Sequence, residues 1–205
     1  MKRLINDGYE VVEEMLEGYA AANKQYVDLD LENRVVVSKL ISEEPRVRVI
    51  VGGGSGHEPM FLGYVGKDFA DAAVVGNVNT SPAPDACYEA VKAVDSGKGC
   101  LYAGDVMNFD MGAEMALEED GIRVETVTTT DDVYSAKDKK DRRGVAGDLP
   151  VFKVAGSAAA KGYDLDKVKA VTEKANDNTY SLGVALSSST LPVTGEVIFQ
   201  MDEGD

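Results

Sequence analysis

The sequence predicts an α/β protein whose mixed, largely parallel sheet is covered by helices on both faces. Short apolar runs alternate with longer segments whose apolar residues recur at helical spacing. A glycine-rich turn follows the apolar run at residues 47–51, and sheets of this class bind ligands at the carboxyl ends of their strands. Hydrophobic residues make up 44% of the 205 residues, which is enough to bury a core.

Two helices and three strands are expected before residue 80. Residues 9–22 carry apolar side chains on one helical face, and Asn6 or Asp7 is in position to cap that helix. After the glycine turn, residues 59–63 are expected to form a short helix. The strands are predicted at three apolar runs, residues 35–37, 47–51 and 72–78.

Two helices flank a predicted strand at residues 100–103. In the first helix, Ser81 is expected to be the cap and Pro82 the first helical residue, and the helix is expected to end near Asp95. The second helix is expected to end at Gly121, because glycine favours helix ends. The residues expected to face the core are Cys87, Ala90, Val91 and Val94 in the first helix, and Phe109, Ala113, Ala116 and Leu117 in the second.

The last third of the chain is predicted to hold an exposed loop, two helices and three strands. The loop covers residues 128–148, which include three threonines and many charges. Asp148 is expected to cap the next helix, with Pro150 in its first turn, and the second helix is expected to span about residues 164–176. The strands are predicted at residues 122–127, 182–186 and 197–201.

The acidic balance of the chain argues against two kinds of partner. With 21 basic and 36 acidic residues, the net charge is −15, which repels nucleic acids and anionic membrane surfaces. No signal peptide or membrane-spanning apolar run is recognised, so we expect a cytoplasmic protein. Cys87 and Cys100 lie in apolar runs and the chain has one histidine, so we expect core cysteines and no metal site.

The stretch from Gly52 to Pro59, Gly-Gly-Gly-Ser-Gly-His-Glu-Pro, has the composition of a ligand-binding loop. Glycines let the backbone approach a ligand with no Cβ in the way, and successive N–H groups can point at an oxygen-rich guest. His57 ends the turn and can donate and accept hydrogen bonds. The stretch is not a Walker A loop, a dinucleotide fingerprint or a nucleophile elbow. A site for a small polar ligand is favoured over a tight turn with a structural histidine.

Asp105 is the second candidate residue, because it follows the predicted strand at residues 100–103. If that strand lies beside the strand at 47–51, Asp105 and His57 face one cavity. A carboxylate there can accept a proton from an attacking hydroxyl. The alternative is that Asp105 only caps the helix that begins near Asn108.

Three further groups of polar residues could bind a ligand or could have only surface or structural roles. Ser55 is expected to bind a ligand through its backbone and hydroxyl rather than to act as a nucleophile. Arg142 and Arg143 are able to hold a phosphate or a partner's carboxylates, although a solvated loop is the commoner outcome. Residues 187–190, three serines and a threonine, are expected to form a surface turn.

Six motifs follow one another along nearly the whole chain. They are Leu4-Ile5-Asn6 with Val11-Val12-Glu13-Glu14, Gly53-Gly54-Ser55-Gly56-His57-Glu58-Pro59, Thr80-Ser81-Pro82, Gly104-Asp105-Val106-Met107-Asn108-Phe109, Asp131-Asp132-Val133 and Arg142-Arg143-Gly144-Val145-Ala146-Gly147. In this order they resemble the K subunit or K domain of the dihydroxyacetone (glycerone) kinase family.

The resemblance implies a glycerone kinase, with dihydroxyacetone bound by Gly54, Ser55, Gly56 and His57. The family's residue at His57 holds a substrate hydroxyl and does acid/base work. Its residue at Asp105 contacts the substrate and is the base for the hydroxyl that attacks phosphorus. ATP and Mg²⁺, or a phosphate relay, belong to a separate nucleotide-binding L domain or subunit, so we expect no cofactor on this chain. A homodimer is also expected.

Two departures from the family pattern limit what the chain is expected to do alone. The family's K subunit continues further, to a later histidine that holds the ketone covalently as a hemiaminal, whereas this sequence ends at Asp205 with His57 as its one histidine. The strand before Asp105 is also shorter than the family's. We therefore expect residues 1–205 to be an N-terminal domain cut before a second segment, and inactive alone. The alternatives are a non-catalytic ketose-binding sensor or coactivator, and a plain α/β domain that binds another anion.

Overall fold

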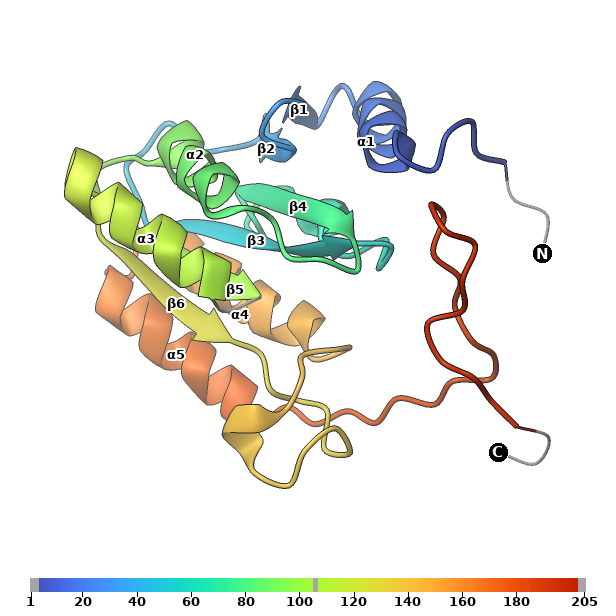
Figure 1. Ribbon diagram of the computed structural model, residues 1–205. Coiled ribbons are helices and arrows are strands. Elements are labelled where there is room, and N and C mark those ends of the chain that lie inside the picture. The colour runs from blue at the N-terminus through green and yellow to red at the C-terminus, as the bar shows by residue number, and fades with distance from the viewer. Residues whose placement is uncertain (1–3, 105–106, 203–205) are drawn as a thin grey trace.

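The computed structural model describes residues 4–104 and 107–202, which form a six-stranded mixed sheet with helices on both faces (Figure 1). The strand order is β1-β2-β4-β3-β5-β6. Neighbours pair in parallel from β4 through β3 and β5 to β6, whereas β2 is antiparallel to both β1 and β4. This confirms the predicted fold class. The strands are β1 Val27–Asp30, β2 Val35–Ser38, β3 Arg48–Ser55, β4 Ala72–Val78, β5 Cys100–Gly104 and β6 Val124–Thr128.

The helices divide between the two faces of the sheet (Figure 1). Helices α2 and α3 pack on one face and against each other, whereas α1, α4 and α5 contribute to the core on the other. No helix in the described ranges is long and apolar enough to cross a membrane. The helices are α1 Val11–Ala22, α2 Pro84–Val94, α3 Met107–Asp120, α4 Asp148–Ala160 and α5 Leu165–Asp177, with short 3-10 helices η1 Leu62–Tyr64 and η2 Lys139–Asp141.

Strand β3 lies inside the sheet and is buried along its whole length. Its side chains alternate between the two cores: Val49 and Val51 join the core under α4 and α5, and Ile50 joins the core under α2 and α3. An apolar strand buried on both faces is typical of a parallel sheet. This double burial fixes the position of β3, and with it the position of the glycines at its carboxyl end.

The sheet grows in opposite directions from β3, with β4 on one side and β5 on the other. In α/β sheets, such a point leaves a crevice at the carboxyl edge, because the loops of the two strands diverge. Residues Arg48–Gly52 of β3 pair with Cys100–Gly104 of β5. The expectation that strands 47–51 and 100–103 are neighbours is therefore confirmed.

Three predictions around the glycine stretch were wrong or incomplete. Residues Gly52–Ser55 do not form a turn but continue β3, because they pair with β4 in parallel register. Helix α2 begins at Pro84 with Ala83 as its N-cap, so Ser81 does not cap it. The short helix expected at residues 59–63 is the 3-10 helix η1, which begins three residues later.

Two predictions from local sequence patterns were also wrong: the cap of α1 and one core residue of α3. The N-cap of α1 is Glu10, and the Asp7 carboxylate instead accepts the Tyr9 N–H at 2.9 Å. The Asn6 amide donates to the Glu14 carboxylate at 2.8 Å. Leu117 of α3, expected in the core, is 57% exposed, whereas Phe109 and Ala116 are buried as predicted.

The segment after α5 does not contain the two strands predicted at residues 182–186 and 197–201. It holds an isolated bridge between Thr190 and Val197 and runs apart from the sheet (Figure 1). An alternating pattern forms a strand only beside a partner, and no named strand of the described sheet pairs with this segment. Its exposed apolar side chains include Leu182, Val184, Leu186, Ile198 and Phe199.

We expect Gly156→Ala to destabilise the fold although alanine favours helices. A Cβ at Gly156 of α4 would lie 2.6 Å from Phe69 Cα and 2.7 Å from Phe69 C. A backbone neighbour cannot rotate away, so the overlap costs about 1–3 kcal/mol. Gly18→Ala in α1 is the matched control, because no atom lies within 4 Å of its added Cβ. Helix propensity should then raise the free energy of unfolding by about 0.5–1 kcal/mol. Urea denaturation measures both, and equal stabilisation by the two variants would contradict the packing of α4.

Candidate functional site

A cavity of about 430 Å³ lies at the carboxyl ends of the parallel strands. Gly53 and Gly54 of β3, Gly104 at the end of β5 and Thr128 at the end of β6 form its floor and walls. This is the crevice where the sheet changes its direction of growth, the usual place for a ligand in such folds. The other lining residues are His57, Phe61, Asn79, Ser81, Thr129, Arg142, Arg143, Gly144 and Asp148.

The glycines of β3 are required by close packing as well as by access to the cavity. A Cβ at Gly53 would overlap the Phe61 ring. At Gly54, a Cβ would lie 2.6 Å from the Thr80 backbone nitrogen and 2.9 Å from the Asn79 carbonyl carbon. A Cβ atom does not approach a non-bonded atom this closely, so the cavity wall at Gly53 and Gly54 must be bare backbone.

His57 reaches the cavity by way of a tight turn at Gly56, whose φ of 94° lies in the left-handed region. The Nδ1 atom of His57 is 2.8 Å from the Gly54 carbonyl oxygen. Because a carbonyl only accepts, Nδ1 carries the proton and donates it. In the neutral ring, Nε2 is then an acceptor for the hydroxyl of a ligand.

Ser55 occupies a different position from the one expected of a ligand-binding hydroxyl. Its side chain is 2% exposed, and its hydroxyl donates to the Gly76 carbonyl at 2.7 Å, which ties β3 to β4. Ser55 and Gly56 line a second cavity of about 260 Å³ beside α1. Of the four loop residues expected to bind the substrate, Gly54 and His57 line the main cavity, and Gly53 lines it as well.

The predicted carboxylate Asp105 lies outside the described residues. Its neighbour Gly104 lines the cavity, pairs with Gly52 of β3 and has a φ of 146°. On the other side of the gap, the Asn108 amide of α3 donates to the Pro82 carbonyl at 2.7 Å.

The loop after β6 is exposed over most of its length, as expected, but its first residues are buried and anchored. Thr129 is 3% exposed and lines the cavity. The buried Asp131 carboxylate accepts the N–H groups of Val145 at 3.1 Å and Gly147 at 2.8 Å, and the Ser181 hydroxyl also donates to it. Asp131 thus fixes both the far end of the loop and the start of α4.

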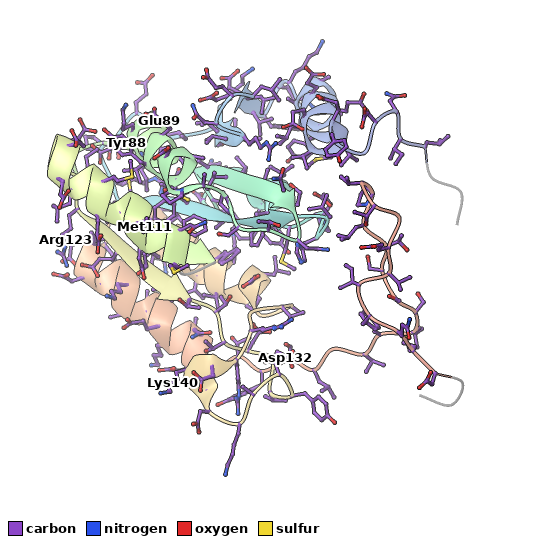
Figure 2. All side chains as sticks on the ribbon, in the orientation of Figure 1. Tyr88, Glu89, Met111, Arg123, Asp132 and Lys140 are labelled. Atoms are coloured by element: carbon purple, nitrogen blue, oxygen red, sulfur yellow. The ribbon has the colours of Figure 1, made fainter. Side chains whose placement is uncertain are left out.

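This anchoring brings two arginines to the cavity of an acidic chain. Arg142 Nε donates to the Ala136 carbonyl at 3.1 Å, and the Arg143 N–H donates to the Ser135 hydroxyl at 3.0 Å. Figure 2 shows Asp132 and Lys140 on the same loop. Guanidinium groups at a cavity suit a phosphoryl group or a carboxylate, so the solvated-loop alternative does not describe these residues fully.

Asp148 was expected to cap α4, and this was wrong. The N-cap is Gly147, no side chain caps the helix, and Asp148 is its first residue. Asp148 is 4% exposed and lines the cavity, and within the described ranges its Oδ1 has no hydrogen-bond partner. The Ser81 hydroxyl, in the same cavity, is likewise unpartnered among the described residues. Unpartnered buried oxygens cost free energy, so two of them in one cavity indicate where a ligand's groups would bind.

Burial raises the pKa of Asp148 from 3.8 to about 7. The Thr129 hydroxyl partly offsets this rise in pKa, Asp131 adds to it, and His57 opposes it. The shift places the titration of this carboxyl group near neutral pH. Perturbed carboxyl groups in clefts are common at functional sites.

We expect Asp148 to make stability fall as pH rises from about 4 to about 7. The folded state keeps the proton up to a pKa of about 7, whereas the unfolded chain loses it near 3.8. In that window the folded state therefore binds more protons, and ionisation costs it up to about 4 kcal/mol. Above about pH 7 the cost stays constant.

Asp148→Asn removes the ionisation and should remove this component of the pH profile. The variant should be more stable than the wild type at pH 8, by up to about 4 kcal/mol, and equally stable near pH 4. Urea denaturation across this range measures the difference. A difference between the two proteins that does not change with pH would contradict the assignment.

Sequence comparison places this chain in a known family. Residues 17–205 match the Dak1 domain. The chain is 74% identical over 211 aligned positions to the dihydroxyacetone-binding subunit of PTS-dependent dihydroxyacetone kinase 2 from Listeria innocua, and the match covers 100% of this chain and 63% of that protein.

Two solved structures have the same fold. The dihydroxyacetone kinase of C. freundii superimposes with a TM-score of 0.85 at 38% identity, over 93% of this chain and 36% of that one, and it has also been solved with AMP-PNP and Mg²⁺. A dihydroxyacetone kinase operon co-activator has a TM-score of 0.84 at 31% identity, over 93% of this chain and 60% of that one. The chain thus spans less than two thirds of each of these relatives. By its sequence and its fold, the chain belongs to the Dak1 domain family.

Proposed function

We propose that the chain is the substrate-binding part of a dihydroxyacetone (glycerone) kinase, which phosphorylates a terminal hydroxyl of dihydroxyacetone. The observation that carries the proposal is the cavity at the carboxyl edge, where bare backbone and one imidazole meet two oxygens that have no partner among the described residues. A small molecule with one carbonyl and two hydroxyl groups matches those donors and acceptors. The names of the relatives support this choice of ligand.

Each predicted site residue has a role in this proposal. The backbone of Gly54 and Nε2 of His57 contact the ketose, while Ser55 and Gly56 hold the turn in place. Asp105, which follows the cavity residue Gly104, accepts the proton of the attacking hydroxyl as the hydroxyl oxygen bonds to phosphorus and the bond between phosphorus and its donor breaks. Phosphoryl transfer depends mainly on positioning and charge stabilisation, so few groups are needed.

The phosphoryl group is proposed to come from a partner. No nucleotide-binding motif was recognised in the sequence, so ATP and Mg²⁺ are assigned to a nucleotide-binding L subunit or domain that docks over the cavity. The complex of the C. freundii kinase with AMP-PNP and Mg²⁺ supports a nucleotide in this family's reaction. We further propose that residues 1–205 act as an N-terminal domain of a K subunit that is cytoplasmic and homodimeric.

We expect His57→Ala to weaken the binding of dihydroxyacetone about tenfold or more. A lost hydrogen bond at a desolvated site costs about 1–3 kcal/mol, and 1.4 kcal/mol is a factor of ten in affinity. Titration calorimetry with the chain measures the change, and Lys24→Ala, at an exposed position, is the control. Absence of binding by the wild type would overturn the proposed ligand, and equal binding by His57→Ala would overturn the role of His57.

A ketose-binding regulator is the second candidate, because the co-activator has nearly the same fold as this chain. Turnover separates the two functions. The chain with ATP alone is expected to give no product, whereas the complete complex, with the nucleotide-binding partner and its phosphoryl donor, is expected to give dihydroxyacetone phosphate. Binding without product in the complete complex would favour the regulator. Product from the chain and ATP alone would contradict the need for a partner.

A further inference from the structure

Asp148 is a buried cavity residue that the proposed reaction does not yet use. It is held in place from two directions: as the first residue of α4 it follows Gly147, whose N–H is bound by Asp131, and it lies against Gly144. A Cβ on Gly144 would lie 3.0 Å from Asp148 Oδ1 and would also overlap the Thr129 hydroxyl. The glycine therefore leaves room for this carboxyl group at the cavity wall.

We propose that Asp148 binds the substrate directly, with its carboxylate Oδ1 accepting a hydrogen bond from a hydroxyl group of the ketose. The proposal rests on the proposed function and deepens it by naming a residue that selects hydroxylated substrates. Its basis is geometric: Oδ1 is buried in the cavity and has no partner among the described residues. A site that is built to bind a hydroxyl discriminates strongly against analogues that lack it, because its polar group then stays unpaired.

The position of Asp148 relative to other charged groups gives binding a pH dependence. His57 follows β3, Tyr64 belongs to η1, and Asp131 follows β6. The two arginines, in the same loop as Asp131, line the cavity together with His57. Burial is the main cause that raises the pKa of Tyr64, and the charge of Asp148 adds to the rise. The phenol of Tyr64 therefore stays neutral near pH 7. Asp148, with a pKa of about 7, therefore changes charge in the range where binding is measured.

Binding should favour the ionised form of Asp148, because a carboxylate accepts a stronger hydrogen bond than a neutral group. The affinity for dihydroxyacetone is therefore full above about pH 7 and is lost as pH falls through that value. Equivalently, binding near pH 7 releases part of a proton, which calorimetry detects by comparing buffers of different ionisation enthalpy. Any pH dependence that remains in Asp148→Asn belongs to another group.

The test compares dihydroxyacetone with hydroxyacetone, which lacks one hydroxyl group, for four proteins. The wild type should prefer dihydroxyacetone, and Asp148→Ala should lose about five- to tenfold of that preference at pH 8. Asp148→Asn, which keeps the shape and is expected to fold well, should bind with intermediate affinity and without proton release near pH 7. Asp132→Asn is the matched control: it removes a carboxylate of the loop after β6 that does not line the cavity, and it should leave both affinities within about twofold of the wild type.

The outcomes separate failure of this inference from failure of the proposed function. If the wild type binds neither compound, the proposed function fails and this inference fails with it. If the wild type binds dihydroxyacetone, and both Asp148 variants keep its preference and its proton release, Asp148 is only a structural residue. Loss of preference in Asp132→Asn as well would show a general charge effect and would also overturn the inference.

Discussion

The close approach of neighbouring elements to the glycines of β3 is the constraint on which the rest of the structure depends. A Cβ at Gly52 would lie 2.8 Å from the Phe109 ring of α3 and would overlap the Val74 carbonyl of β4. At the next two positions, Phe61 and the backbone at residues 79–80 take the same space. Helix α3, strand β4 and the loops on either side can therefore close around β3 only because these residues have no side chains.

The same constraint produces the cavity. The glycines near the end of β3 have no side chains. The loop after β6 can therefore bring Thr129, two arginines and Asp148 to the edge of the sheet without a clash. The carboxyl group of Asp148 is then buried at a cost to stability, with one oxygen unpartnered in the described part of the chain. Proteins commonly tolerate such local costs at sites where a ligand completes the missing interactions.

The spacing of apolar residues was sufficient to predict the helices and strands that pack against the hydrophobic core. The apolar residues of α2, and strand β4 from residue 72 to 78, lie where their spacing predicted. Features that depend on distant residues were missed. The local sequence predicts that Asp148 caps a helix. The start of that helix is instead set by the Asp131 carboxylate, which accepts the N–H of Gly147 sixteen positions away. The alternating pattern at residues 182–186 failed for the converse reason, because no strand pairs with it in the described sheet.

The central claim is that a small ketose binds at the carboxyl edge of the sheet, on the bare backbone of β3. The most direct measurement follows the backbone amide signals of the isotope-labelled chain by NMR as dihydroxyacetone is added. The account predicts that the largest shifts occur at Gly53, Gly54 and Gly104, with Thr128 and Thr129 next to them. Shifts confined to the cavity at the opposite edge, which Gly97, Gly121 and Arg123 line among others, would contradict it.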